Sequence, residues 1–257
     1  MKLTANRPAI AALMFFLTTV SGWSILIRPD RADQKYLELA AKYPASVCLN
    51  LPDGEGTLIA PRWLLTAAHL AKDIKTGEAS AKITIGKREY RVEKVFPHPD
   101  YKNAKSGADL ALVKLTEAVT EVKPVNIYRG VGEVAKVATI VGHGYSGTLD
   151  KGPVSKDKWD KKKRAATNKI ERLIQKKWLL FVVDLPEKAT DLEGAGGPGD
   201  SGGPAFIEED GKVFVAGVSS FTDDTQGDGI IGNFGDREAF TRVSIFAEWI
   251  DQTIKEN

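Results

Sequence analysis

The sequence contains very few cysteines and histidines, and it carries little net charge. Cys48 is the only cysteine, so no disulfide can form within the chain, and its apolar neighbours predict a buried small side chain. The three histidines lie far apart, and no cysteine–histidine spacing fits a zinc motif, so no metal site is expected. A formal net charge of +2 on 257 residues gives no reason to expect a nucleic-acid partner or an anionic membrane.

The chain also has no apolar run long enough to span a bilayer comfortably. An uncharged stretch near the start, Ala9–Val20, has twelve residues, follows two basic residues, and is followed by the small residues Gly22 and Ser24. This pattern predicts a signal peptide over residues 1–24, cleaved after Gly22 or Ser24, rather than an uncleaved anchor. We therefore expect a secreted or periplasmic protein with no stable membrane anchor after cleavage.

From Ser46 onward, short apolar runs alternate with glycine, proline, asparagine and aspartate. Many short strands at close spacing predict an all-β sandwich or barrel rather than βαβ units. Short helices are expected at Asp30–Lys42, ended by Pro44, and at Ser244–Lys255, and Val119–Tyr128 could link two halves. The expected strands are Val47–Leu51, Gly56–Ile59, Trp63–Thr66, Lys82–Ile85, Tyr90–Phe96, Leu110–Leu115, Val134–Val141, Trp178–Val183, Ala205–Ile207, Val213–Ser220 and Phe240–Val243.

The segment Asp150–Lys177 is rich in lysine and has two readings. A site for an anionic partner is one, and a solvated surface loop is the other. Acidic residues are interspersed among the lysines, which favours the surface loop.

The stretch Pro198–Pro204 is a glycine-rich turn with one hydroxyl, Ser201, at its centre. Glycine lets the backbone turn sharply and lets a ligand come close. A serine beside exposed backbone N–H groups is what acyl transfer requires, whereas the simpler interpretation is a turn between two strands. The choice depends on a base for the serine and an acid that orients the base.

Candidates for these two groups are His69 and Asp109. His69 follows a buried-looking strand that begins at Trp63, whereas His98 lies between two prolines and His143 lies in a loop. A histidine at a strand end is, by itself, more often structural than catalytic. Asp109 begins a strongly apolar strand, and a carboxylate entering a core needs a partner because burying it unpaired is costly.

Three segments, Thr66–His69, Asp109–Leu112 and Gly199–Pro204, together resemble the signature blocks of the trypsin-like, chymotrypsin-fold serine proteases. They occur in that family's order of His, Asp and Ser. The resemblance covers roughly residues 44–250, and it points to a disulfide-free branch of bacterial type, since Leu70 and Gly197 stand at usual cysteine positions.

The resemblance implies an all-β fold of two six-stranded antiparallel β-barrels, with the active site between them and a short C-terminal α-helix. The expected domains are a signal peptide over 1–24, the N-terminal segment and first barrel with His69 and Asp109 over 25–123, and the second barrel with Ser201 and the terminal helix over 124–257.

The family also implies a role for each residue. Ser201 would attack the scissile carbonyl, His69 would act as base and then acid, and Asp109 would orient His69. The N–H groups of Gly199 and Ser201 would form the oxyanion hole. This chemistry needs no cofactor. Extended substrate would pair as a β-strand with the backbone of Ser220, Phe221 and Thr222.

In the family, a newly formed N-terminal amine pairs with the carboxylate that precedes the serine, which is Asp200 here. No Ile-Val-Gly-Gly-like activation motif is present, but Ile25 begins an apolar segment directly after one of the two signal cleavage sites. The hypothesis is that signal cleavage itself creates the activating N-terminus at Ile25. The alternative is an internal partner for Asp200, with no activation step.

Substrate preference depends on two positions. Ala195 falls at the floor of the specificity pocket, where trypsin itself has an aspartate, so an ordinary preference for Lys or Arg is not supported. Glu238 falls near the back wall of the pocket and could select a basic side chain. Its other reading is a solvent-facing residue in an irregular loop.

The sequence therefore predicts an exported, monomeric serine endopeptidase that acts on protein or peptide substrates. An inactive relative that serves as a binding or scaffold protein is the alternative, and the presence of His69, Asp109 and Ser201 argues against it. An esterase is disfavoured by the order of the three residues and by the lack of a strand-Gly-x-Ser-x-Gly-helix pattern.

Overall fold

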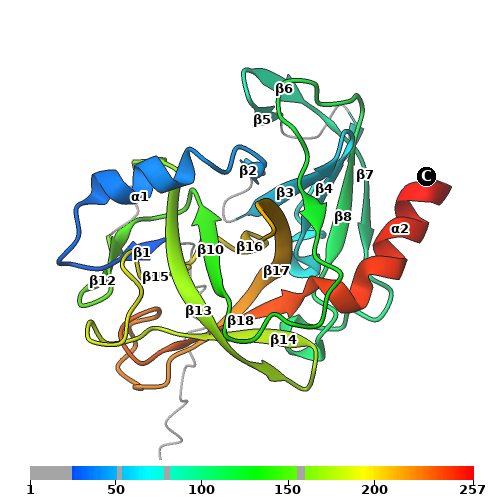
Figure 1. Ribbon diagram of the computed structural model, residues 1–257. Helices are drawn as coiled ribbons and strands as arrows, with labels where there is room; N and C mark the ends of the chain where they lie inside the picture. Colours follow the sequence, from blue (N-terminus) through cyan, green and yellow to red (C-terminus); the bar gives the residue numbers. More distant parts are fainter. Residues whose placement is uncertain (1–24, 51–53, 78–81, 155–159) are drawn as a thin grey trace, which may run out of the picture.

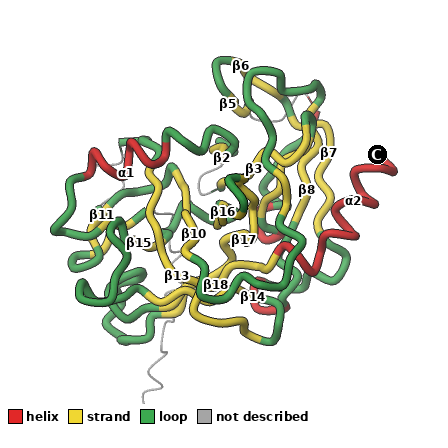
Figure 2. Tube along the Cα trace, viewed as in Figure 1, coloured by secondary structure: helices red, strands yellow, loops and turns green. Residues whose placement is uncertain are grey.

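The computed structural model describes residues 25–50, 54–77, 82–154 and 160–257, so the predicted signal peptide lies outside the described residues. Strands dominate these ranges and form two groups that lie side by side (Figure 1). Helical segments lie at the edges of this β-structure (Figure 2). The expected all-β fold is confirmed.

The first group is a five-stranded antiparallel sheet with a hairpin packed over it. Its sheet order is β2 (Ser46–Cys48), β3 (Glu55–Ala60), β4 (Trp63–Thr66), β8 (Ala111–Leu115) and β7 (Val92–Pro97). The hairpin consists of β5 (Ile83–Ile85) and β6 (Arg88–Tyr90), whose apolar side chains join the same core. The single strand expected over Tyr90–Phe96 is therefore wrong, because the chain leaves β6 at Tyr90 and pairs with β8 from Val92.

The second group closes into a six-stranded antiparallel barrel. Its order is β16 (Pro204–Glu209), β10 (Val137–Gly142), β13 (Arg164–Ile174), β14 (Trp178–Val182), β18 (Arg237–Arg242) and β17 (Lys212–Asp223), and β17 pairs back onto β16. Its core combines aliphatic side chains with aromatic rings, among them Phe181 and Phe240, whose centroids are 5.0 Å apart. The short strand β9 (Asn126–Ile127) extends β17 in parallel and brings the chain over from the first group.

The lysine-rich segment Asp150–Lys177 was expected to be a solvated surface loop, and this expectation is wrong for its second part. Its second part is β13, in which Ala166, Asn168 and Ile170 are buried at alternate positions. Thr167 and Lys169, which alternate with them, are less buried, as the period of two in a strand predicts. Lys163, just before β13, donates hydrogen bonds to the carbonyls of Tyr43 and Ser46 at 3.1 and 3.0 Å, and burial lowers its pKa.

The N-terminal segment lies against the second barrel although it precedes the first group in sequence (Figure 1). Leu26–Ile27 forms β1 in a small sheet with β11 (Gly147–Thr148), β12 (Gly152–Pro153) and β15 (Gly194–Ala195). Helix α1 (Asp33–Ala40), which falls within the expected Asp30–Lys42, packs along β13. The ion pairs of Arg164 with Asp33 and Asp160, 2.6 and 2.7 Å long, anchor this contact.

The C-terminal helix α2 (Ala247–Glu256) follows a 3-10 turn and returns from β18 to the first group. His98, a buried residue after β7, packs against Phe246 and Trp249 with ring centroids 4.8 Å apart in both cases. Burial lowers the pKa of His98, so this contact uses the neutral imidazole. Within the described ranges, no helix has the length and apolar character needed to span a bilayer.

Candidate active site

The side chains of His69 and Asp109 meet at the border between the two groups of strands. Asp109 lies two residues before β8, and its side chain is completely buried. The imidazole Nδ1 of His69 lies 2.7 Å from Oδ2 of Asp109, and the backbone N–H of His69 donates to Oδ1 at 2.8 Å. His69 is thus held by both its ring and its backbone, in the arrangement expected for a base and the acid that orients it.

Two residues of the second barrel complete the surroundings of Asp109. The Ser220 hydroxyl in β17 donates to Oδ2 at 2.7 Å, and the Thr241 hydroxyl in β18 donates to the backbone carbonyl of Asp109 at 3.1 Å. The sequence indicated that Asp109 needed partners, but it assigned Ser220 only a backbone role and missed Thr241. Neither contact has a local signal, because the strands that supply them follow Asp109 by more than a hundred residues.

Ser201 lies in the turn between β15 and β16, and two glycines of this turn have left-handed backbone. Gly199 has φ of 106° and Gly202 has φ of 79°. A Cβ on Gly202 would overlap the Thr66 hydroxyl and would lie 2.5 Å from the carbonyl oxygen of Glu55. Because Thr66 ends the strand that leads into His69, this close approach brings the Ser201 turn against the His69 segment.

The backbone N–H groups of the turn fall into two sets. Those of Asp200, Gly202 and Gly203 donate to backbone carbonyls at 2.8 to 3.1 Å. In the described chain, the N–H groups of Gly199 and Ser201 have no acceptor, and no hydrogen bond joins the Ser201 hydroxyl to His69. Catalytic hydrogen bonds are often long before substrate binds. The two free donors are the ones expected to receive an oxyanion.

Asp200 is buried beneath the same turn, with 2% of its surface exposed. Its carboxylate accepts the N–H groups of Gly197 at 3.1 Å and Gly144 at 3.3 Å, and it packs against Gly142. Burial, and then the nearby carboxylate of Glu55, raise the pKa of Asp200 well above its usual range. No basic side chain of the described ranges forms an ion pair with Asp200.

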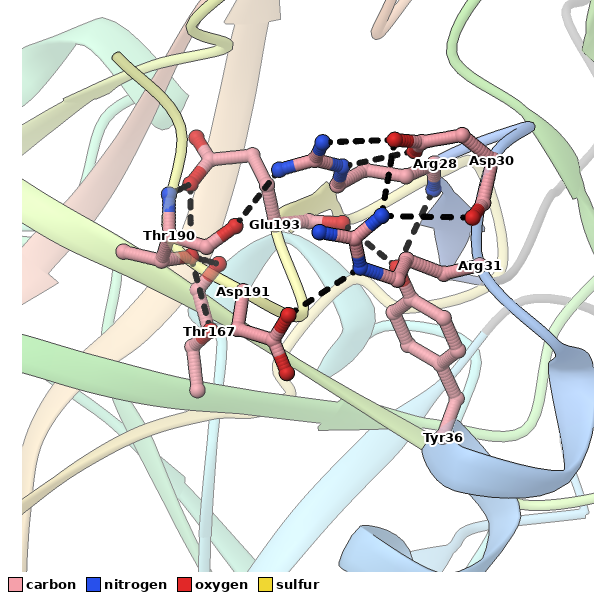
Figure 3. Close-up of polar contacts among 8 residues, drawn as sticks. All are labelled: Arg28, Asp30, Arg31, Tyr36, Thr167, Thr190, Asp191 and Glu193. Carbon is pink, nitrogen blue, oxygen red and sulfur yellow. Dashed lines mark hydrogen bonds and ion pairs between the residues drawn. The ribbon is translucent and has the colours of Figure 1, made fainter. Parts of the chain in front are cut away.

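Ile25 is buried beside the strand that leads into the Ser201 turn. In β1, Leu26 pairs with Ala195 and Ile27 with Gly194. The structure therefore brings Ile25 to β15 and not into contact with the Asp200 carboxylate. Polar contacts fasten the chain just after Ile25 (Figure 3); they join Arg28 to Asp30 and the Thr190 carbonyl, Arg31 to Asp191, and the Tyr36 hydroxyl to the Glu193 carbonyl.

Glu238 is inside the protein, so the solvent-facing alternative is wrong. It lies in β18 opposite Thr222 of β17, is 2% exposed, and packs against Gly196, next to the buried Ala195. Among the described residues, its Oε2 has no hydrogen-bond partner. Burial raises the pKa of Glu238 to about 8. The loop alternative fails because β18 begins at Arg237, three residues earlier than expected, and so includes Glu238.

The strand expected to receive substrate has an open edge. From Ser220 to Asp223, β17 pairs with β18 and with no other described strand. The ring of Phe221 packs edge-on against Trp178 at 5.9 Å, and the Lys105 ammonium lies 5.4 Å from its centroid. In the described part of the chain, no cluster of His, Cys, Asp or Glu side chains is arranged to hold a metal ion.

A family model described as Trypsin matches residues 39–250. The chain belongs to the trypsin family. This family member is 29% identical over 226 residues to chymotrypsin-like elastase family member 1 of Macaca fascicularis, a match that covers 79% of each chain. It is 28% identical to the Homo sapiens protein of that name, over 79% of this chain and 81% of the relative. It is also 28% identical to proproteinase E of Bos taurus, over 79% and 83%.

Replacement of Gly202 by Ala should destabilise this trypsin-family protein more than replacement of Gly211. Both glycines have positive φ, 79° and 69°, so both variants carry the same backbone strain of about 1 kcal/mol. Only Gly202 has backbone and side-chain atoms within 3.0 Å of the added Cβ, whereas Gly211 has nothing within 4 Å. Denaturant unfolding of Gly202→Ala and Gly211→Ala measures the difference. Equal losses would mean that the turn does not pack on the His69 segment as described.

Proposed function

We propose that this protein is an exported serine endopeptidase that hydrolyses peptide bonds through an acyl-enzyme. The observation that carries the proposal is the buried Asp109 carboxylate, 2.7 Å from the imidazole of His69, beside a turn with free N–H groups at Gly199 and Ser201. Membership of the trypsin family, whose members are serine peptidases, supports the same reaction class. We infer that the enzyme works as a monomer in a secreted or periplasmic location.

Acylation would begin at Ser201. Its Oγ attacks the scissile carbonyl carbon while His69 Nε2 takes the hydroxyl proton, and Asp109 stabilises the imidazolium through Nδ1–H. The negative oxygen of the tetrahedral intermediate accepts hydrogen bonds from the N–H groups of Gly199 and Ser201. His69 then gives its proton to the leaving amine, the C–N bond breaks, and the acyl group stays on Ser201.

Deacylation repeats these steps with water. His69 removes a proton from water, the resulting oxygen attacks the acyl carbon, and the proton passes to Oγ as Ser201 leaves. Substrate bound as a strand on the open edge of β17 would hold the scissile bond still during both stages. Ser220 would serve twice, because its backbone faces substrate and its hydroxyl binds Asp109.

Ser201→Ala and Asp109→Asn should remove most turnover of a fluorogenic peptide. Loss of the nucleophile or of the correct imidazole tautomer each lowers kcat by about 10⁴-fold or more in this type of site. Ser220→Ala removes one hydrogen bond to a carboxylate, so it should cost less, about tenfold. Circular dichroism of each variant controls for folding. If the parent protein and all three variants show the same negligible turnover, the binding or scaffold alternative is favoured.

We also propose that cleavage after Ser24 activates the enzyme by freeing the amine of Ile25, which pairs with Asp200. Three features support this pairing: Asp200 is buried, its pKa is raised, and it has no cationic partner in the described chain. A buried carboxylate in this state gains most from a nearby ammonium group. Ile25 already lies beside β15. This strand begins at Gly194, four residues before Pro198, where the Ser201 turn starts.

The mature protein should therefore begin at Ile25. N-terminal sequencing of the exported protein identifies its first residue, and assays of chains that start at Ile25 and at Trp23 compare their kcat/KM. The Ile25 chain should be the active one, and Asp200→Asn should lower its activity toward that of the Trp23 chain. A mature chain that begins at Trp23 with full activity contradicts this mechanism.

We propose further that Glu238, beside Ala195, selects a basic side chain at the cleavage site. Because the pKa of Glu238 is raised to about 8, its carboxyl is protonated at neutral pH and becomes charged above that value. Only the charged form attracts Lys or Arg. The free Oε2 would supply the acceptor.

The ratio of kcat/KM for Lys or Arg substrates to that for Leu substrates should rise as pH passes through about 8, since this parameter reports the free enzyme. The ratio cancels any pH dependence of the chemical step that the two substrates share. Glu238→Gln should make the ratio independent of pH. A flat ratio in the parent enzyme would reject Glu238 as the selector.

A further inference from the structure

A second buried carboxylate, Glu55, joins the two groups of strands behind the Ser201 turn. It is the first residue of β3 and is 1% exposed. His143, which follows β10 in the second barrel, donates its backbone N–H to Oε1 of Glu55 at 3.0 Å. The ring Nδ1 of His143 lies 3.1 Å from Oε1 and 3.0 Å from Oε2. One carboxylate therefore holds both the backbone and the ring of this histidine.

The backbone of Glu55 contacts the candidate active site directly. Its N–H donates to the carbonyl of Ser201 at 2.8 Å, and its carbonyl accepts the Thr66 hydroxyl at 2.6 Å. The carbonyl of Ser201 belongs to the peptide unit after the proposed nucleophile. Glu55 thus fixes the turn on the side opposite to the free N–H groups of Gly199 and Ser201.

The loop at His143 connects Glu55 to Asp200. The next residue along, Gly144, donates its N–H to the Asp200 carboxylate at 3.3 Å, and Asp200 in turn accepts the N–H of Gly197 at 3.1 Å. The contacts form a closed circuit that runs from Ser201 through Glu55, the loop and Asp200 back to the turn. A shift of the loop would therefore move the turn at two points.

Stability alone gives no good reason for this arrangement. A buried carboxylate and its polar partner seldom add net stability relative to apolar packing, because both groups lose their hydration. Here a second carboxylate, Asp200, lies close enough for its pKa to be raised by Glu55, which makes the burial more costly. Burial of Glu55 costs stability, and its backbone contacts Ser201, the proposed nucleophile. We therefore attribute the arrangement to the conformation that it imposes on the Ser201 turn.

We infer that Glu55 and His143 are positioning residues that hold the Ser201 turn so that the N–H groups of Gly199 and Ser201 point at one oxyanion. The inference rests on the proposed peptidase function. Hydrogen bonds to an oxyanion act only when the carbonyl becomes tetrahedral, so their misalignment lowers kcat and leaves ground-state binding nearly unchanged.

Glu55→Gln and His143→Gln, singly and together in the mature full chain, test the inference. Each single variant should lower kcat by about 10- to 100-fold, the range for a weakened oxyanion contact, with KM within about threefold. The double variant should be no worse than the poorer single variant, because the two side chains act as one unit. Glu133→Gln is the matched control, since Glu133 is also a buried carboxylate and is held by a side chain far along the sequence, Arg242 at 2.7 Å. It should lower the unfolding midpoint and leave kcat unchanged.

The binding affinity for a peptide aldehyde distinguishes a positioning role of Glu55 from a purely structural one. The aldehyde forms a tetrahedral adduct with the serine, whereas the matching peptide amide binds without one. Affinity for the aldehyde should fall in Glu55→Gln by the same factor as kcat, and affinity for the amide should stay unchanged. Equal losses for the two ligands, or an unchanged kcat in a folded variant, would overturn the inference.

Amide hydrogen exchange tests the positioning without any catalysis. Exchange at Gly144 and Gly197 should quicken in Glu55→Gln while exchange in β13 stays unchanged, and Glu55→Asp serves as a second variant if the first does not fold. Unchanged exchange at both glycines rejects the inference. If the parent protein hydrolyses no peptide yet exchange quickens as expected, the proposed function fails while the circuit of contacts stands.

Discussion

The buried carboxylate of Asp109 is the interaction on which the structure depends most. A carboxylate without hydration needs several donors, and Asp109 obtains them from His69 on one side and Ser220 on the other. Thr241 adds a contact to its backbone. These donors come from both groups of strands, so the residue that orients the imidazole also joins the two groups. The same contacts therefore stabilise the fold and align the candidate active site.

Four buried carboxylates surround the Ser201 turn, and their partners distinguish them. Asp109 binds an imidazole and a hydroxyl, Glu55 binds His143, and Asp200 binds only backbone N–H groups among the described residues. Glu238 keeps one oxygen without a partner in the described part of the chain. Asp200 and Glu238, the two without a side-chain donor among these residues, have raised pKa values and are the ones proposed to receive a cation, from the N-terminus and from substrate.

The sequence predicted those parts of the molecule whose signals are local. Three contiguous motifs around His69, Asp109 and Ser201 predicted the candidate site, and apolar runs predicted most strands within a few residues. Strand β13 was missed because it carries four charged residues and its buried positions include a charged one, Arg164, and a polar one, Asn168. Strand β1 was missed because a strand of two residues is too short to show an alternating pattern. Contacts such as Glu55 with His143 join positions 88 residues apart, so only the folded chain reveals them.

Labelling with a serine-directed fluorophosphonate tests the central claim most directly, because the reagent needs a serine activated by a base and an oxyanion hole. Mass spectrometry of the mature protein should find one adduct, on the peptide that contains Ser201, and Ser201→Ala should take up none. Absence of an adduct on folded protein, or an adduct on another residue that persists in Ser201→Ala, would contradict the proposed mechanism.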